Sequence, residues 1–300
     1  MRRILLVISM VALSLSTNAQ LLYRISGNGL ARPSYLLGTY HFCASSFVDS
    51  IPGFHEAMDN SEQACGELVM ADIGNLENVM KMQKAMMLPE GKSIQSMLKP
   101  EDLSALNGLL RQVMGADLST PGMGEALGKM TPAALSTQLS AMMYLKYDPN
   151  ASAQDGIDTR VQDLAKEKGK KVLGVETVDD QINVLFNSQT VERQLQMLMC
   201  MVKHQDEQVQ MTGKIVKAYR SQDRDAVLQL TDEKFNDECD STEEEENALI
   251  YGRNAKWVEA MPAMMGEAPT FFAFGAAHLP GEKGVIQLLR NAGYTVEGMK

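Results

Sequence analysis

The 300-residue sequence has only four histidines, one tryptophan and no long hydrophobic run beyond its first residues. No later apolar stretch approaches the ~20 residues of a membrane-spanning helix, so we expect no transmembrane segment. The sequence also lacks a Gly-x-Ser-x-Gly motif, a phosphate-binding P-loop and a Gly-x-Gly-x-x-Gly motif. These absences argue against a serine hydrolase, a nucleoside triphosphatase and a dinucleotide-binding enzyme.

Positive charge is also scarce. The chain has 28 lysines and arginines against 38 acidic residues, which gives a formal net charge of −10. Nucleic-acid binding depends on lysine and arginine contacts with phosphates, so we expect no nucleic-acid partner. The composition leaves open a peptide or small-molecule substrate and does not indicate an oligomeric state.

The four cysteines are Cys43, Cys65, Cys200 and Cys239, and none of them forms a Cys-x-x-Cys pair. A zinc knuckle or a thioredoxin-type site is therefore not indicated. In an oxidising compartment four cysteines allow three disulfide pairings, and proximity in sequence favours Cys43–Cys65 with Cys200–Cys239. Free buried cysteines are the alternative.

The N-terminus resembles an export signal. Arg2 and Arg3 precede the apolar stretch 4–15, and small residues follow up to Ala19. This pattern is typical of a secretory signal peptide over residues 1–19, cleaved near Ala19. We therefore expect a periplasmic or secreted protein.

Apolar runs and helical periodicity alternate at both ends of the remaining chain. Short apolar runs indicate strands at 21–26, 35–37, 64–70, 170–177 and 268–278, with a last strand from 294. Residues from about 75 to 150 and from 178 to 231 have helical spacing. The pattern predicts one α/β domain over residues 20–300. Its central mixed, mostly parallel sheet is covered by helices, with a large helical insertion at about 75–150.

Two histidines follow apolar runs in the same way: "SYLLGTYH" ends at His41 and "TFFAFGAAH" ends at His278. Glu176 follows the run "KKVLG", and Glu67 lies inside the run "ACGELVM". Ligands of open α/β sheets collect beyond the carboxyl ends of the strands. We therefore expect these four side chains to meet at one edge of the sheet.

Two imidazoles and a carboxylate are a plausible ligand set for a divalent metal ion such as manganese, cobalt or zinc. This reasoning assigns His41, His278 and Glu67 as metal ligands, and Glu67 or Glu176 as general base. Arg253 and Asn254, on a helix at about 247–260, would hold the substrate or an oxyanion. The alternative is that both histidines are structural and that the glycines only allow turns.

The two remaining histidines, His55 and His204, give little indication of a metal site or a catalytic role. "HEAMD" at 55–59 resembles the start of a helical zinc motif, but its fifth residue is Asp59, with which His55 could share a hydrogen bond. His204 lies in a polar helical stretch, and we expect it to be exposed.

Several of these segments together resemble the TraB/GumN family. They are "YLLGTYHF", "GELVM", "GIDTRVQDLAKEKGKKVLGVETVDDQ", "YGRNAKW" and "FFAFGAAHLPGEKGVIQLLRNAGYTVE", spread over residues 21–297. Carried over residue by residue, the resemblance places the family's paired Gly-x-x-His motifs at His41 and His278. Its acidic residues fall on Glu67 and Glu176, and its Arg-Asn pair on Arg253 and Asn254.

The resemblance implies one of two alternative functions for this fold. TIKI-like members are described as divalent-metal-dependent peptidases, which implies a metal-dependent hydrolase that acts on peptides outside the cytoplasm. The family is also similar to a haem-binding lipoprotein. The alternative is therefore a non-catalytic protein that sequesters a peptide, haem or another small ligand.

Overall fold

The computed structural model describes residues 20–148 and 155–299, and the predicted signal peptide lies outside them. Six strands form one sheet within this part of the chain, in the order β4-β3-β5-β2-β1-β6. Their bounds are β1 Leu22–Gly27, β2 Ser34–Thr39, β3 Gln63–Gly66, β4 Lys171–Gly174, β5 Thr270–Gly275 and β6 Tyr294–Gly298. Each overlaps one of the predicted strands, and β3 and β4 are shorter than predicted.

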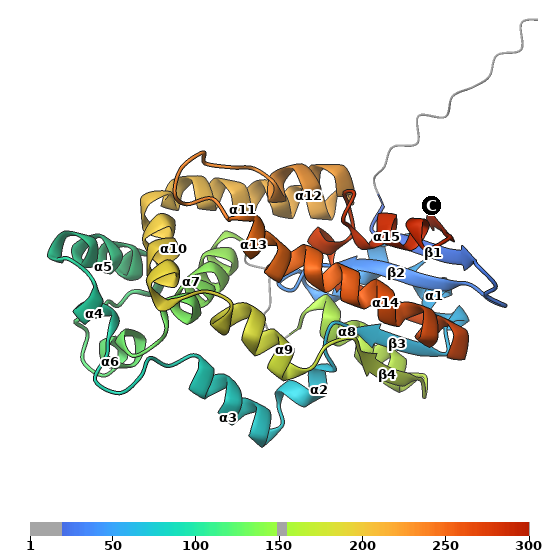
Figure 1. Cartoon of the computed structure of the whole chain (residues 1–300), viewed down its shortest axis with the longest axis horizontal. Helices are drawn as coiled ribbons and strands as arrows, with labels where there is room; N and C mark the ends of the chain where they lie inside the picture. Colours follow the sequence, from blue (N-terminus) through green and yellow to red (C-terminus); the bar gives the residue numbers. More distant parts are fainter. Residues whose placement is uncertain (1–19, 149–154, 300) are drawn as a thin grey trace, which may run out of the picture.

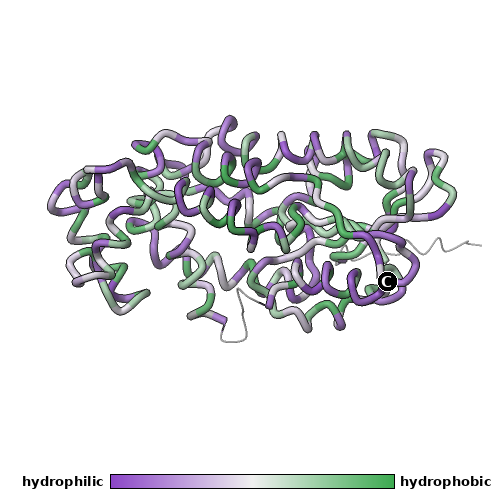
Figure 2. The backbone as a smooth tube through the Cα atoms, turned by 90° about the horizontal axis from the view of Figure 1, so that it is seen from below, coloured by the Kyte–Doolittle hydropathy of each residue, from purple (hydrophilic) through white to green (hydrophobic). Residues whose placement is uncertain are grey.

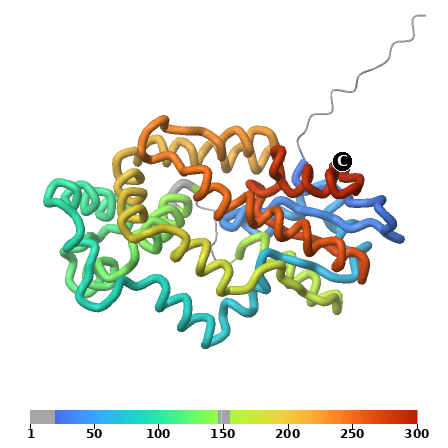
Figure 3. Tube along the Cα trace, viewed as in Figure 1, coloured from blue at the N-terminus to red at the C-terminus, as the bar shows by residue number. Residues whose placement is uncertain are grey.

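The sheet is mixed and mostly parallel, as predicted. Strand β3 pairs in parallel with β4 and with β5, and β5 pairs in parallel with β2. Strand β1 is antiparallel to both β2 and β6. The trace brings the two ends of the described chain side by side, because β1 pairs with β6 (Figure 3). The four parallel strands therefore direct their carboxyl ends to one edge of the sheet.

Helices cover the sheet and build a second lobe (Figure 1). The α-helices are α1 Phe54–Asn60, α2 Met70–Ile73, α3 Leu76–Ala85, α4 Ile94–Met97, α5 Pro100–Met114, α6 Met123–Gly128, α7 Pro132–Tyr147, α8 Ile157–Glu167, α9 Val178–Ile182, α10 Val191–Lys203, α11 Gln205–Arg220, α12 Arg224–Thr231, α13 Glu243–Glu246, α14 Gly252–Glu267 and α15 Val285–Asn291. Short 3₁₀ helices are η1 Ser45–Ser50 and η4 Ala276–His278, and π-helical turns are η2 Asn183–Asn187 and η3 Asn247–Tyr251.

Both faces of the sheet are buried. Successive residues of a strand point to opposite faces, so a strand covered on both sides is a continuous apolar run. Leu37 and Phe271 pack in the core cluster beneath α1 and α8. Leu36 and Phe272 pack in a second cluster against α14 and α15. The α/β fold predicted from the uninterrupted apolar runs is confirmed.

A third core cluster holds the helical lobe together. It joins α5, α7 and α10 through fully buried leucines that include Leu106, Leu135 and Leu198. The helices alternate between hydrophilic and hydrophobic residues along their turns, as amphipathic helices do (Figure 2). This lobe contains not only the helices of the predicted insertion at about 75–150 but also α10, which belongs to the second helical stretch predicted at 178–231.

One of the two expected disulfides is present. Cys200 on α10 is bonded to Cys239, which lies in the segment between α12 and α13. Cys43 and Cys65 are both buried and free, so the pairing Cys43–Cys65 was wrong. Cys65 lies on β3 and Cys43 follows β2, and β5 separates these strands in the sheet. Proximity in sequence had suggested a contact that the strand order prevents.

Candidate active site

His41 and His278 follow neighbouring parallel strands. In the β2–β5 register, Thr39 lies opposite Gly275, so both Gly-x-x-His segments leave the sheet at the same edge. Gly275 is needed there, because a Cβ on it would lie 3.2 Å from Glu67 Oε1 and 3.4 Å from His278 Cδ2. The glycine thus allows the strand end to approach both side chains.

The two glutamates follow the next two strands. β3 ends at Gly66 and β4 at Gly174, so Glu67 and Glu176 both lie just beyond the strand ends. The prediction that Glu67 lies within a strand was therefore wrong by one residue. The amide of Glu176 donates to the carbonyl of Glu67 at 2.9 Å, which continues the pairing of the two chains past the sheet. Four adjacent strands thus deliver four side chains to one edge.

The guanidinium group of Arg253 joins both carboxylates. Its Nε and Nη2 donate to the two carboxylate oxygens of Glu176 at 2.7 and 2.9 Å. Nη2 also donates to Glu67 Oε2 at 2.7 Å. All three side chains are at most 11% exposed. A buried arginine between two carboxylates satisfies charges that would otherwise be costly to bury.

Helix α14 positions Arg253 through its first turns. The π-helical turn η3 precedes α14, and Arg253 Nη1 donates to the carbonyl of Leu249 in it at 3.0 Å. Gly252 fits this turn because a Cβ there would lie 2.8 Å from the carbonyl oxygen of Asn247. One helical turn after Arg253, Trp257 Nε1 donates to Glu176 Oε1 at 2.9 Å. The guanidinium carbon of Arg253 also lies over the Trp257 ring, 4.8 Å from the ring centroid.

His278 is a buried imidazole with a fixed tautomer. Burial lowers the pKa of His278 to about 4, so the ring is neutral at neutral pH. Its Nε2 lies 3.3 Å from Arg253 Nη1, and an arginine can only donate, so Nε2 accepts. Nδ1 therefore carries the hydrogen and donates to Asn254 Oδ1 at 2.6 Å.

Asn254 orients His278 from inside the core. It is fully buried, and its Nδ2 donates to the carbonyls of His278 and Lys283 at 3.2 and 2.9 Å. Both polar atoms of its side chain are therefore engaged within the protein. This geometry fits a positioning residue rather than the substrate contact expected from the sequence.

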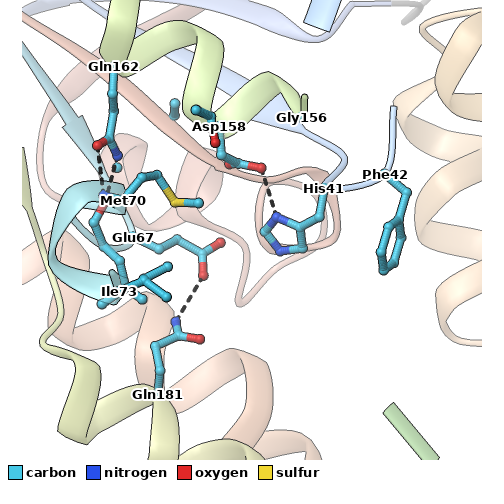
Figure 4. A pocket seen from close by; sticks show the side chains of 13 residues that line it. His41, Phe42, Glu67, Met70, Ile73, Gly156, Asp158, Gln162 and Gln181 are labelled. Carbon is cyan, nitrogen blue, oxygen red and sulfur yellow. Dashed lines mark hydrogen bonds and ion pairs between the residues drawn. The ribbon is translucent and has the colours of Figure 1, made fainter. Parts of the chain in front are cut away.

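His41 presents its ring to solvent. Its Nδ1 lies 2.8 Å from Asp158 Oδ2, and Thr39 Oγ1 donates to the other carboxylate oxygen at 2.7 Å. The negative charge of Asp158 and the hydrogen bond between Asp158 and His41 raise the pKa of His41 to about 9. The ring is 64% exposed, and its Nε2 is directed away from Asp158 (Figure 4). Metal ligation through Nε2 needs the neutral imidazole, so it has to release a proton.

We expect Asp158→Asn to lower the pKa of His41 from about 9 toward its ordinary 6.5. The raised pKa means that the charged pair stabilises the fold fully below pH 6.5, and that this contribution is lost as the pH rises through about 9. NMR titration of the His41 ring protons measures the shift. A pKa that stays near 9 in the variant would show that another group sets it.

Some of these residues, His41, Glu67 and Asp158 among them, line a cavity of about 220 Å³. Its polar wall is made by His41, Asp158, Glu67 and Gln181, and Figure 4 shows Gln181 directed toward Glu67. Gln181 Nε2 donates to Glu176 at 2.6 Å and to Glu67 at 3.3 Å. Apolar side chains also line the cavity: Met70 and Ile73 lie near Glu67, and Phe42 lies on the other side of His41 (Figure 4). A cavity that combines polar and apolar side chains suits a ligand with an apolar side chain.

Glu67 is the carboxylate that faces this cavity. Burial opposes its charged form, yet its pKa lies below the ordinary value because His278 when protonated, Arg253 and the Gly275 amide stabilise the carboxylate. The Gly275 amide donates to Glu67 Oε1 at 2.8 Å. Glu67 is therefore ionised at neutral pH and retains acceptor capacity toward the cavity.

The side chains fit a divalent cation in the chemistry of their donors. Metal-bound histidines usually donate their other ring hydrogen to a carboxylate or carbonyl oxygen, which fixes the tautomer. His41 has this arrangement with Asp158, and His278 has it with the amide oxygen of Asn254. His41 thus offers Nε2 directly, His278 would offer Nε2 once Arg253 Nη1 moves away from it, and Glu67 adds an ionised oxygen. In the structure these ligand atoms are spread around Arg253 and do not all lie within 4.8 Å of one another. Among the described residues, the ligand atoms of His204, Asp237 and Cys239 do.

The histidines outside the site have other partners. His55 pairs with Asp49 at 2.8 Å, and Asp59 pairs with Lys168, so the hydrogen bond expected between His55 and Asp59 is absent. The expectation that His204 is exposed was also wrong, because its side chain is 16% exposed and stacks on Phe235.

Comparison with known proteins agrees with this architecture. Residues 21–298 match the TraB/PrgY/gumN family, which covers nearly the whole described chain and both Gly-x-x-His segments. The chain belongs to this family.

Three TraB/PrgY/gumN-related proteins are similar over most of this chain. Metalloprotease TIKI1 of Danio rerio is 28% identical over 304 residues, which cover 88% of this chain and 60% of that protein. The metalloprotease TIKI homolog of Nematostella vectensis is 26% identical, over 89% of this chain and 65% of that protein. Metalloprotease TIKI2 of Danio rerio is 24% identical, over 88% and 58%. The chain thus spans less than two thirds of each relative. No solved structure matches it.

Sequence reasoning missed three residues of the site: Asp158, Gln181 and Trp257. Asp158 opens α8, where a carboxylate also suits the positive end of the helix, so its pairing with His41 left no separate signal. Trp257 lies four residues after Arg253, a spacing that places both on one helix face.

Within the described residues, none of the helices combines the length and the hydropathy that crossing a membrane requires.

Proposed function

We propose that this protein is a metal-dependent peptidase that acts outside the cytoplasm, after export through the signal sequence at residues 1–19. The observation that carries the proposal is the meeting of His41, Glu67, Glu176 and His278 at the carboxyl ends of four adjacent parallel strands. The names of the metalloprotease relatives support the same chemistry.

In this proposal His41, His278 and Glu67 hold a divalent cation, either manganese, cobalt or zinc. The bound cation would supply Lewis-acid polarisation of the scissile carbonyl and lower the pKa of water. Glu67 takes the proton from the attacking water, because it is ionised and lines the cavity. Met70 and Ile73, which line the cavity beside Glu67, contact an apolar side chain of the peptide.

The remaining site residues keep Glu67 and His278 in place. Both oxygens of Glu176 accept hydrogen bonds, from Arg253, Trp257 and Gln181. Glu176 therefore anchors the guanidinium that holds Glu67 ionised. Asn254 fixes the His278 tautomer. We assign Glu67 as the base and Glu176, Arg253 and Asn254 as positioning residues.

Chelation should abolish hydrolysis if the proposal is correct. Purified protein is incubated with a peptide library with and without Mn²⁺, Co²⁺ or Zn²⁺, and cleavage is followed by mass spectrometry. We expect cleavage that stops with a chelator and returns when one of these ions is added back. Cleavage that is unchanged after exhaustive chelation would remove the metal from the proposal.

A non-catalytic role is the second candidate, in which the cavity sequesters a peptide, haem or another small ligand. It is favoured by one feature: Arg253 already pairs with both carboxylates, so each of them has a charged partner without a metal ion. Saturable binding of library peptides without any turnover, in the presence of each metal ion, would support this role over the peptidase.

A further inference from the structure

A second group of metal-binding side chains lies away from the strand ends. His204, Asp237 and Cys239 each offer one ligand atom, and these atoms all lie within 4.8 Å of one another. Among the described residues this is the one group of three or more histidine, cysteine and acidic side chains that meets this distance. Cys239 is bonded to Cys200, so its sulfur is not available as a thiolate in this state.

The bonded partner belongs to the same cluster. Cys200 and His204 are four residues apart at the end of α10, a spacing that brings side chains to one helix face. Asp237 and Cys239 are two residues apart in the segment between α12 and α13. A Cys-x₃-His pair on a helix thus faces an Asp-x-Cys pair on a loop. Two thiolates, an imidazole and a carboxylate form a four-ligand set that zinc binds as a tetrahedron.

The imidazole and the carboxylate are already close to the required arrangement. His204 Nε2 lies 3.1 Å from Asp237 Oδ2. Two ligand atoms bound to one tetrahedral zinc ion are about 3.3 Å apart, given bonds of about 2.0–2.1 Å. Phe235 stacks on the His204 ring at 4.1 Å, and the Cys239 amide donates to Asp237 Oδ1 at 2.9 Å. Both side chains are therefore oriented before any ion binds.

One cation competes for the site. Lys203 Nζ lies 2.7 Å from Asp237 Oδ2. The lysine side chain is half exposed and also reaches Glu238, so it can leave Asp237 for water or for Glu238 at little cost. The pKa of Asp237 is lowered to about 2, mainly by Lys203 and the Cys239 amide, so the carboxylate is charged at neutral pH.

We propose that the Cys200–Cys239 disulfide masks a zinc site formed by Cys200, His204, Asp237 and Cys239, which becomes available while the two cysteines are reduced. A phosphine opens it in vitro: phosphorus attacks one sulfur and breaks the S–S bond. Hydrolysis then yields two thiols and the phosphine oxide, whose oxygen comes from water. The phosphine is oxidised by two electrons and the disulfide is reduced by two. Zinc then displaces both thiol protons to the buffer.

The disulfide and the zinc ion would tie the same two segments. Either one joins α10 to the loop before α13, across a sequence separation of 39 residues. That loop leads into α13, η3 and α14, and so to Arg253. Arg193 of α10 supports the same connection through Glu245 at 2.8 Å. A chain that has not yet formed its disulfide would therefore still hold this connection when zinc is present. The inference stands independently of the proposed peptidase activity.

Cobalt provides a spectroscopic test on the full chain. The protein is treated with a water-soluble phosphine, the phosphine is removed without oxygen, and Co²⁺ is added to the reduced and to the untreated protein. We expect a near-ultraviolet sulfur-to-cobalt charge-transfer band and tetrahedral ligand-field bands only after reduction. Zinc should remove both bands. Cobalt at the His and Glu side chains of the strand ends gives no thiolate band, so the two sites are distinguishable.

Variants decide whether the four named side chains form the site. His204→Ala and Asp237→Asn should each weaken cobalt binding by reduced protein about tenfold or more. Cys239→Ser leaves Cys200 as the one sulfur ligand and should weaken the charge-transfer band, and replacement of both cysteines by serine should remove it. His55→Ala is the matched control and should leave binding unchanged. Untreated protein controls for the free thiols of Cys43 and Cys65. The proposal fails if reduced protein shows no thiolate band, or if His204→Ala and Asp237→Asn bind as the wild type does.

Discussion

Replacement of Arg253 by methionine should lower the free energy of unfolding by about 3–5 kcal/mol and abolish hydrolysis. The change removes the only guanidinium that any described residue places against Glu67 and Glu176, whose side chains are 11% and 8% exposed. Two carboxylates of like charge then remain buried together without a cationic partner, and the pKa of Glu67 must rise. Denaturant unfolding followed by circular dichroism measures the loss at neutral pH.

The pH dependence gives an internal control for this result. In the wild type the lowered pKa of Glu67 means that its contribution to stability is present above the ordinary glutamate pKa and is lost as the pH falls through the folded-state pKa. The difference between Arg253→Met and wild type should therefore shrink in acid. The combined variant with Glu67→Gln and Glu176→Gln should recover stability at neutral pH but not hydrolysis. A loss below about 1 kcal/mol for Arg253→Met at pH 7 would contradict this account of the cluster.

His41→Ala should reduce metal-dependent peptide hydrolysis by roughly 10³-fold and leave the fold intact. The ring is 64% exposed, so its removal takes little from the core, and Thr39 still donates to Asp158. The activity loss follows from removal of an Nε2 donor at the cavity. Initial rates at saturating metal, thermal unfolding and calorimetric titration with Zn²⁺ measure activity, fold and metal affinity separately.

His55→Ala is the matched control for this variant. His55 is similarly exposed, at 57%, and pairs with Asp49 at the same distance of 2.8 Å. It does not line the cavity. Its rate should stay within about twofold of wild type, since surface substitutions away from special features have small effects. Equal rates and equal zinc affinity for His41→Ala and wild type would remove His41 from the proposed metal site.

The meeting of the four strand-end side chains could be anticipated from local patterns. Continuous apolar runs ending at glycine indicated buried strands, and parallel strands place their carboxyl ends on one edge. His41, Glu176 and His278 follow from those two rules, whereas Glu67 was placed inside a strand and lies one residue beyond its end. Strand order was not needed, because any order of parallel neighbours would bring these side chains to the same edge.

The interactions among these residues could not be anticipated in the same way. The hydrogen bond from His41 to Asp158 spans 117 positions, and the contact of Arg253 with Glu67 spans 186. No periodicity encodes such pairs, since they depend on how α8 and α14 pack on opposite faces of the sheet. The burial that lowers the pKa of His278 to about 4 has the same origin.

The cysteines show the same division. Proximity in sequence suggested both disulfides, yet only Cys200–Cys239 forms. Cys65 lies on β3 and Cys43 follows β2, and β5 lies between these two strands.

By itself the sequence determined the α/β class, the strand positions and the residues at the strand ends, because these depend on hydrophobic periodicity along the chain. Only the tertiary structure decided which side chains pair, which are buried and which carry charge, because these properties depend on contacts between segments far apart in sequence.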